Sequence, residues 1–461
     1  MSHSNNVLEW NIAQLSESLQ SKQVSPVEIT QASLNAIAEK DPELNSFITV
    51  MEEEALQKAK QAESEIFSGN YKGYFHGIPI GLKDLIHVKG IKTTFGSEIY
   101  HDFVPDYDAE IVKRLEHAGA IIVGKLNMHA CAYGATGDRS FYGPVKNPHN
   151  LNKIAGASSS GSGASVAASM LYASIGSDTG GSVRLPASCC GIVGMKPTFG
   201  RVSKHGAMPL CPTLDHLGPM TRTVTDNALM LNILSGFDAK DPYSVDSAPE
   251  DFTRRIHKGV SGKKIGIPIS FYFDIIHPEV QKIFDLSVEK LKLQGAEIEY
   301  VDLPGMNDLI TAQQVISIAE AYKSLEKHFQ EYPEKIEEEV RGRLIAGMFI
   351  QASEYLHMLK IKHKAINMHL QVLDKVDVLM TPTLCVLPTD IGQREFELNG
   401  KKEHTRILTR LLGPSNTTGF PAISVPGGFS TNGLPVGIQF IGKPFDEAQL
   451  YQFAAALEKA V

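Results

Sequence analysis

Residues 154–198 read IAGASSSGSGASVAASMLYASIGSDTGGSVRLPASCCGIVGMKPT, and small residues crowd this stretch. Glycine, serine and alanine suit a backbone that turns sharply or lies close to a substrate. A Ser/Gly linker would stay polar and flexible, but apolar residues such as Val166, Ile175 and Val193 recur here at core-like intervals. The stretch therefore predicts folded, buried and tightly turned backbone.

Two serines in this stretch stand at the ends of glycine-containing turns, Ser158 and Ser182. The alanine-rich segment 165–173 between them predicts a short helix, with Gly176 as its C-terminal cap. The turn 178–182 offers consecutive backbone N–H groups beside a hydroxyl, which is the equipment of an oxyanion hole with its nucleophile. A serine nucleophile needs a base, and the rest of the chain must supply it.

A candidate base closes an earlier apolar run. Residues 77–82 read GIPIGL, a strand-like segment that ends on Lys83 and Asp84. Lysine is almost never fully buried unless it is paired, so either the ammonium reaches solvent or it lies in a polar site inside the protein. Composition gives these two interpretations equal weight. The second would supply the base, because burial favours the neutral amine.

A helix followed by a strand occurs twice along the chain. Residues 108–118 predict a helix and residues 120–124 a buried strand, and the pattern recurs at 278–294 and 296–301. Two such units predict an α/β fold in which helices cover a sheet. No repeat or low-complexity linker divides the chain.

Helical patterns dominate two other parts of the chain. Ser25 and Glu28 form a capping box for a helix expected to end near residue 40, and with a further helix expected over 52–68 they predict a helical layer in residues 1–70. Residues 309–375 are also largely helical and more highly charged. They form either a lid near the substrate entrance or an exposed helical layer.

The composition is that of an ordinary globular protein. Hydrophobic residues make up 43% of the 461 residues and charged ones 21%, with a net charge of −8. No Lys/Arg block accompanies an aromatic stripe, so a nucleic-acid surface is not expected. The sequence shows neither a signal peptide nor an apolar run of membrane-span length, which predicts a cytoplasmic protein without membrane contact. The five cysteines are expected to be buried free thiols.

Several common catalytic motifs can be tested against the sequence. Residues 156–165 lack the lysine of a phosphate-binding P-loop. Neither Ser158 nor Ser182 lies in G-x-S-x-G, and H-E-x-x-H is absent from the sequence. The polar and aromatic stretch 127–147 suits a loop over a site, and its His129 is expected to be structural.

Three segments resemble the catalytic segments of the amidase signature family. They are GIPIGLKD at 77–84, GASSSGSGAS at 156–165 and GSDTGGSVRLPASCCGIVGMKPT at 176–198, and the spacing between them also agrees with that family. Further segments that resemble the family lie at 214–231, 377–383, 419–426 and 433–450. The likeness spans nearly the whole chain and implies one large α/β domain with a central mixed sheet covered on both faces by helices.

The resemblance implies a Ser-Ser-Lys triad, with Ser182 as nucleophile, Ser158 as bridging hydroxyl and Lys83 as base. It implies an oxyanion hole made of backbone N–H groups at Thr179, Gly180, Gly181 and Ser182, and no metal or cofactor. Family members hold the bridging serine on a cis peptide, here Ala157-Ser158. Most relatives carry glycine where this chain has Ala157 and Ser160. The expected substrate-binding residues are Tyr133, Gly134 and Ser159.

The function expected from these features is hydrolysis of a carboxamide through an acyl-enzyme on Ser182, carried out by a single domain over residues 1–461. The expected partner is a small-molecule amide substrate. Neither nucleic acid nor a membrane is expected to bind, and a homodimer is a candidate assembly. The alternative is the A subunit of a glutamyl-tRNA amidotransferase, which releases ammonia for a partner subunit. Thr409 stands where those proteins carry an aspartate, which favours the first interpretation. A second alternative is a catalytically silent binding scaffold.

Overall fold

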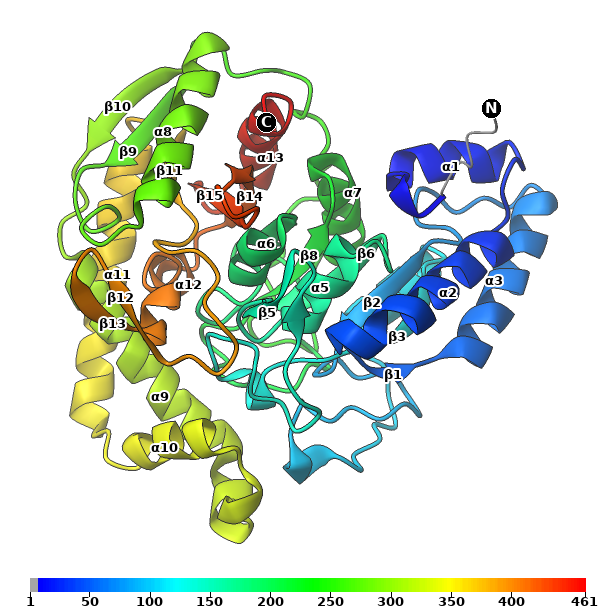
Figure 1. Ribbon diagram of the computed structural model, residues 1–461, viewed down its shortest axis with the longest axis horizontal. Helices are drawn as coiled ribbons and strands as arrows, with labels where there is room; N and C mark the ends of the chain where they lie inside the picture. The colour runs from blue at the N-terminus through cyan, green and yellow to red at the C-terminus, as the bar shows by residue number, and fades with distance from the viewer. Residues whose placement is uncertain (1–6) are drawn as a thin grey trace.

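The computed structural model describes residues 7–461, and one mixed sheet runs through this part of the chain (Figure 1). The sheet has eleven strands. In spatial order they are β1 (Phe47–Val50), β3 (Ile121–Leu126), β2 (Pro79–Lys83), β6 (Ala173–Ser177), β8 (Leu217–Thr221), β7 (Val193–Lys196), β14 (Ala422–Phe429), β15 (Pro435–Ile441), β11 (Val378–Pro382), β9 (Lys264–Pro268) and β10 (Glu297–Val301). Two small hairpins lie outside it, β4 (Lys146–Asn147) with β5 (Asn150–Ile154) and β12 (Glu395–Leu398) with β13 (Lys401–His404).

Helices flank this sheet, and in Figure 1 the α9–α11 segment extends away from it at one end. The α-helices are α1 (Ile12–Gln20), α2 (Pro26–Leu44), α3 (Glu52–Phe67), α4 (Glu110–His117), α5 (Ser160–Ala167), α6 (Arg184–Cys190), α7 (Val224–Leu234), α8 (Pro278–Leu293), α9 (Met306–Glu331), α10 (Glu338–Gly347), α11 (Ala352–Leu373), α12 (Gly413–Thr418) and α13 (Glu447–Glu458). Short 3-10 helices are η1 (Val7–Glu9), η2 (Glu98–Tyr100), η3 (Ala130–Ala132), η4 (Pro333–Lys335) and η5 (Thr405–Thr409). The predicted α/β class, a central mixed sheet between helices, is confirmed.

The direction of three neighbouring strands determines where the site lies. β2 runs parallel to β3 on one side and to β6 on the other. Parallel neighbours end at the same edge of a sheet. The last residues of β2 and β6, Lys83 and Ser177, are therefore brought together although 94 positions separate them in the sequence.

The segment between the two turn serines differs from the prediction. The helix occupies Ser160–Ala167 instead of 165–173, and Gly176 lies inside strand β6 instead of capping a helix. β6 passes so close to the helix that a Cβ on Gly176 would lie 2.8 Å from the Ser159 hydroxyl. The strand must use small residues here, and such residues have low strand propensity, so the sequence pattern does not reveal it.

The predicted N-terminal helical layer is also interrupted by a strand. The capping box is confirmed, since the Ser25 hydroxyl accepts from the Glu28 N–H and the Glu28 carboxylate accepts from the Ser25 N–H. The helix continues through Pro42 because Asn45 takes a left-handed conformation and caps it at that point. β1 follows and pairs with β3 at the edge of the sheet. Residues 1–6 of the predicted layer lie outside the described residues.

Candidate active site

Lys83 ends β2 with its side chain fully buried and surrounded by hydroxyl groups. Its Nζ donates to Ser158 Oγ at 2.7 Å, Ser177 Oγ at 2.8 Å and Ser159 Oγ at 3.0 Å. The three bonds match the three N–H groups of an ammonium. No carboxylate lies within ion-pair distance of Lys83 in residues 7–461. Burial lowers the pKa of Lys83 well below that of an ordinary lysine, and the charges of Asp178 and Asp215 oppose that shift only in part.

Asp84, the neighbour of Lys83, points to a different strand. One of its oxygens lies 3.1 Å from Lys125 Nζ, and the other accepts from the backbone N–H and the hydroxyl of Thr94. Successive side chains of a strand leave on opposite faces, which is why Lys83 and Asp84 enter separate environments. Lys83 thus keeps no carboxylate that would hold its proton.

The turn before Ser158 delivers the bridging hydroxyl without the cis peptide that the family resemblance implied. No cis bond occurs among residues 7–461; instead Gly156 and Ala157 are both left-handed, with φ of +96° and +48°. The Ala157 N–H donates to the carbonyl oxygen of Ala135, which fixes the turn against the 127–147 loop. Two successive left-handed residues reverse the chain sharply enough to bring Ser158 Oγ to Lys83 with every peptide trans.

Ser182 lies directly beside this turn. Its Oγ accepts a long hydrogen bond of 3.4 Å from the Ser158 backbone N–H, and its side chain is 8% exposed. Among the bonds within residues 7–461 the two serine hydroxyls are not joined to each other. Catalytic hydrogen bonds are often long in ligand-free structures and tighten when substrate binds. Lys83, Ser158 and Ser182 therefore lie in one cluster.

The turn that carries Ser182 is braced from inside by Asp178. Its carboxylate accepts from the N–H groups of Gly181 and Val183, at 2.8 and 3.1 Å, and forms a buried ion pair with Arg184 at 3.0 Å. Asn416 on α12 donates to the same carboxylate at 2.7 Å. These bonds hold the pKa of Asp178 below its usual range despite burial.

This brace changes the set of oxyanion donors expected from the sequence. The Gly181 N–H already points at the Asp178 carboxylate and is not free for a substrate. Thr179, Gly180 and Ser182 keep N–H groups for which the described residues provide no hydrogen bond. Gly181 has a different role: with φ of +119° and Leu412 atoms 2.3 Å from where a Cβ would lie, it lets the turn pass against α12.

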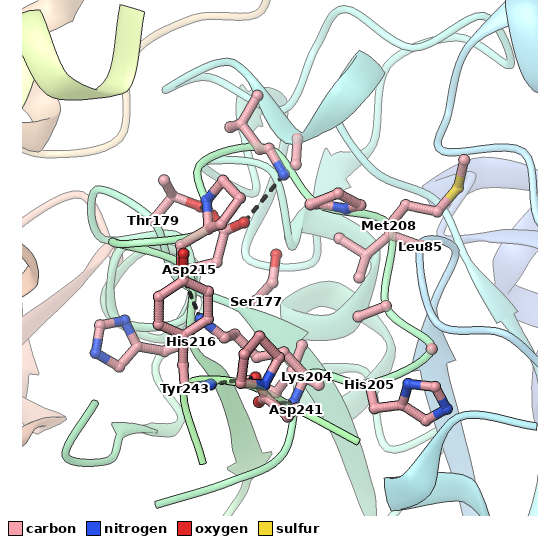
Figure 2. A pocket seen from close by; sticks show the side chains of 18 of the residues that line it. Leu85, Ser177, Thr179, Lys204, His205, Met208, Asp215, His216, Asp241 and Tyr243 are labelled. Carbon is pink, nitrogen blue, oxygen red and sulfur yellow. Dashed lines mark hydrogen bonds between the residues drawn. The ribbon is translucent and has the colours of Figure 1, made fainter. Parts of the chain in front are cut away.

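A cavity of about 240 Å³ adjoins the turn (Figure 2). Ser177 and Thr179 form its inner wall, and the segments 204–217 and 240–243 form the rest. The Thr179 hydroxyl donates to Asp215 at 2.5 Å, and Asp215 also accepts from the backbone N–H of Cys211 at 2.9 Å. The oxyanion turn is thus tied to the cavity wall through one carboxylate.

The residues expected to bind substrate lie in three different settings. Tyr133 packs beneath the Arg343 guanidinium, 5.1 Å from its ring centre, and burial raises the pKa of its hydroxyl to about 12. Gly134 lies flat on the His129 ring, where a Cβ would come within 2.0 Å of an imidazole carbon. His129 is buried next to this glycine.

Ser159, the third residue expected to bind substrate, has its hydroxyl occupied by protein groups. Its hydroxyl accepts from Lys83 and from the Ser177 N–H and donates to the Ser177 carbonyl oxygen at 3.1 Å. A hydroxyl has one donor and two acceptor positions, so none is left for a substrate. The residue is part of the support of Lys83.

The sequence analysis missed Ser177, Asp178, Arg184 and Asp215 as site residues. Each of them is near the two turn serines in sequence or in a segment that resembles the family. The signal that could have drawn attention to Asp178 and Arg184 is a charged pair inside an otherwise small and apolar stretch, because such charges are buried only when paired. Nothing in the sequence distinguishes Ser177 from the other serines of residues 154–198.

Comparison with known proteins gives the class of enzyme to which this arrangement of strands, turn and buried lysine belongs. The family model described as Amidase matches residues 28–451. The chain belongs to this amidase family, and it is an enzyme that cleaves amide C–N bonds.

The relatives are named more specifically. The chain is 37% identical to the A subunit of glutamyl-tRNA(Gln) amidotransferase from Geobacter sp. (strain M21), over 98% of this chain and 97% of that protein. The solved structure of the A subunit from Thermotoga maritima is 35% identical, with a TM-score of 0.84 over 100% of this chain and 96% of that one. A second solved structure is described by the words "An unexpected vestigial protein complex reveals the evolutionary origins of an s-triazine catabolic enzyme"; it is 30% identical, with a TM-score of 0.94 over 98% of both chains.

These names correct the expected partners. A small-molecule amide as the sole partner, with no nucleic acid and at most a homodimer, conflicts with relatives that are subunits of a tRNA-dependent amidotransferase. The reason for the error is that net charge and basic stripes report a direct nucleic-acid surface, whereas one component of a larger enzyme need not carry such a surface itself. The alternative interpretation, the A subunit of an amidotransferase, is better supported than the free-standing amidase.

Three further observations concern the described residues. Between residues 7 and 461, no group of three or more His, Cys, Asp or Glu side chains is arranged to hold a metal ion. In the same part of the chain, each helix is too short or too polar to cross a membrane. The five cysteines are free and buried, as predicted.

Proposed function

We propose that this protein is the amide-cleaving subunit of an amidotransferase: it hydrolyses a carboxamide through an acyl-enzyme on Ser182 and releases ammonia for a partner subunit. The observation that carries the proposal is the 2.7 Å hydrogen bond from Lys83 Nζ to Ser158 Oγ, which lies beside Ser182. Within residues 7–461, no carboxylate forms an ion pair with Lys83. The full-length likeness to the A subunits of glutamyl-tRNA(Gln) amidotransferases supports the part played by a partner. Residues 1–461 act as one amidase domain in the cytoplasm in this proposal.

The reaction begins with Lys83 as a neutral amine. Lys83 accepts a proton from the Ser158 hydroxyl while Ser158 accepts one from Ser182, so that Ser182 Oγ attacks the amide carbonyl carbon. The negative charge on the carbonyl oxygen is stabilised by the free N–H groups of Thr179, Gly180 and Ser182. Return of the proton through Ser158 to the amide nitrogen breaks the C–N bond, releases ammonia and leaves the acyl group on Ser182. Water then attacks the ester carbonyl carbon and gives a proton to Ser158, while Ser158 passes its own to Lys83. As the ester bond breaks, that proton returns through Ser158 to Ser182 Oγ and the carboxylic acid leaves.

The position of helix α9 favours a substrate entrance in front of the turn 178–182. The Gln313 side-chain nitrogen lies 3.1 Å from the position that a Cβ of Gly180 would take, so α9 reaches the oxyanion turn directly. One helical turn further, Ser317 lies beside the Tyr133 hydroxyl. We therefore expect the acyl side of the substrate to lie between Gln313, Tyr133 and the turn 178–182, with residues 309–375 beside the entrance.

Thr409 bears on which carboxamide this protein cleaves. Thr409, which stands where they are expected to carry an aspartate, ends η5 and donates its hydroxyl to the Arg406 carbonyl oxygen at 3.1 Å. A substrate ammonium would find no carboxylate at this position. This observation favours a second candidate, an amidase that acts on another carboxamide within a protein complex, and the likeness to the chain from the vestigial protein complex is consistent with it.

One assay tests both candidates. Ammonia release is measured from glutamine, asparagine and simple carboxamides, with the purified chain alone, with co-expressed partner subunits of the same organism, and with ATP and glutamyl-tRNA(Gln). Glutamine-dependent ammonia release that rises on adding partners, ATP and tRNA supports the first candidate. Release from another carboxamide, dependent on a partner but indifferent to tRNA, supports the second. The matched control is Ser182→Ala, which should lose about a millionfold in rate; a variant that retains a tenth of the wild-type rate contradicts both.

A further inference from the structure

The three hydroxyls that surround Lys83 are not equivalent. Ser158 faces Ser182 and belongs to the relay. Ser159 is closed, because the backbone of Ser177 and Lys83 occupy its whole hydrogen-bonding capacity. Ser177 differs from both: apart from the bond from Lys83, its hydroxyl makes no hydrogen bond within residues 7–461.

Ser177 is also the hydroxyl of the three that borders the cavity. It is the last residue of β6 and lines the cavity beside Thr179. In Figure 2 its hydroxyl projects between Thr179 and Leu85 toward the cavity. A cavity of about 240 Å³ has room for water, since one molecule needs only about 10–15 Å³ on this measure and polar partners such as Asp215 and Lys204 line it.

A fully buried lysine needs a path by which its proton reaches solvent. The path through Ser158 and Ser182 is closed whenever Ser182 is acylated, because the ester oxygen carries no proton. The path through Ser159 ends on a backbone carbonyl. Ser177 offers an acceptor position to Lys83 and an O–H to the cavity, which is the arrangement of a proton link.

We infer that the Ser177 hydroxyl connects Lys83 to water in the cavity and lets the lysine equilibrate with solvent. Lys83 as an ammonium gives a proton to Ser177 Oγ while the Ser177 O–H gives its own proton to a cavity water. The products are the neutral amine, an unchanged Ser177 and a hydronium ion in the cavity. The inference rests on the proposed function, in which neutral Lys83 is the base, and makes Ser177 a positioning residue.

Other charged groups face this region and must be considered in any pH profile. Asp178 and Asp215 act on Lys83 from the oxyanion turn and from the segment before β8. Burial and the nearby Lys196 hold the pKa of His216 well below its usual value. Asp215 accepts its hydrogen bonds from Thr179 and from backbone N–H groups. Ser177 is the cavity-lining residue whose hydroxyl accepts a hydrogen bond from Lys83. The cavity wall adds further titratable groups, which are Lys204, Lys240, His205, His216 and Asp241.

The test compares Ser177→Ala with Ser159→Ala. Each variant removes one acceptor from the ammonium, and a hydrogen bond to the charged form favours that form. The basic limb of kcat/KM should therefore move to lower pH in both, by about one to two pH units. Only Ser177→Ala removes the link, so after a rapid pH jump applied to the acyl-enzyme, in which the path through Ser182 is closed, only this variant should show a lag before the new rate is reached. Ser177→Thr keeps a hydroxyl and should restore the rapid response.

Each outcome decides the inference. A limb that shifts without a lag in Ser177→Ala makes Ser177 an acceptor alone and overturns the proton link, and an equal lag in Ser159→Ala overturns it as well. If Ser177→Ala fails to fold, Ser177→Thr and Ser159→Ala are compared with wild type. The proton link predicts no lag in either variant, so a lag in either one overturns it. Failure of the proposed function is seen separately, as activity retained in Ser182→Ala.

Discussion

Two lysines on neighbouring strands of this sheet are both completely buried, yet their surroundings are opposite. Lys125 on β3 lies 3.1 Å from the Asp84 carboxylate and donates to the Thr93 hydroxyl at 2.7 Å. Lys83 on β2 contacts serine hydroxyls only. Burial lowers the pKa of both lysines, but Asp84 counteracts it at Lys125 through a direct contact. At Lys83 no contacting carboxylate offsets the effect of burial, and this is the difference between the two lysines.

Replacing Lys83 should have the largest effect on the reaction. Lys83→Ala removes the base, and a positioned base contributes about 10²–10⁴-fold to a rate. We expect kcat/KM for amide hydrolysis to fall by that factor and its basic limb to disappear. The measurement is a pH series of ammonia release by wild type and variant. A variant with the same limb and rate would show that the proton leaves Ser182 by another route.

Replacing Lys125 should affect stability instead of chemistry. Lys125→Met leaves Asp84 as a buried charge without its partner, which costs about 3–5 kcal/mol in the free energy of unfolding. The rate per folded molecule should stay within a few-fold of wild type. Urea unfolding and active-site titration measure the two quantities.

The double variant Lys125→Met, Asp84→Asn is the control, because removing both charges should recover part of the lost stability. A large loss of rate in Lys125→Met with unchanged stability would break the contrast between the two lysines.

The pH dependence of stability gives a third, smaller test. Because the pKa of Lys83 is lowered in the folded state, the unfolded chain holds a proton that the folded chain lacks at pH values between the folded pKa and 10.5. Stability from this group should rise with pH through that window, by about 1.4 kcal/mol per unit of pKa shift in total.

We expect Lys83→Met to abolish this rise. At pH values below the window, Lys83 is charged in both the folded and the unfolded protein. The variant should be more stable than wild type there, because it no longer buries that charge. Unfolding in urea at a series of pH values measures both effects. Identical slopes in the two proteins would mean that Lys83 contributes nothing to the rise of stability with pH.

The smallest expected effect concerns the turn that brings Ser158 to Lys83. Ala157 has φ of +48°, which costs a non-glycine residue about 1–2 kcal/mol. Ala157→Gly relieves this cost but removes a buried methyl group worth about 0.8 kcal/mol and adds backbone freedom to the unfolded chain. We expect thermal stability close to that of wild type and unchanged activity.

Ala164→Gly in helix α5 is the matched control. It is buried and right-handed, so it gains no such relief and should lower the free energy of unfolding by about 1 kcal/mol or more. Equal losses in the two variants would show that the left-handed turn stores no strain.

The fold class and the identity of the central residues follow from the amino-acid sequence alone. Lys83, Ser158 and Ser182 stand in short motifs, and the helix-then-strand units and the capping box at Ser25 are local patterns, so neighbouring residues suffice to predict them. Which groups meet depends on tertiary contacts. The bond from Lys83 to Ser177 and the pairing of Asp84 with Lys125 join residues on separate strands, and their contact depends on strand order and register.

Tertiary contacts also determine which groups remain free. The Gly181 N–H is occupied by Asp178, and Ser159 is filled by Lys83 and β6, although the sequence presents these groups as equal to their neighbours. Strand β6 escaped prediction because close packing against α5 selects glycine and serine over strand-forming residues. A sequence specifies the chemical groups that a chain carries, but hydrogen-bonding capacity and desolvation are set by neighbours that only the folded backbone brings into contact.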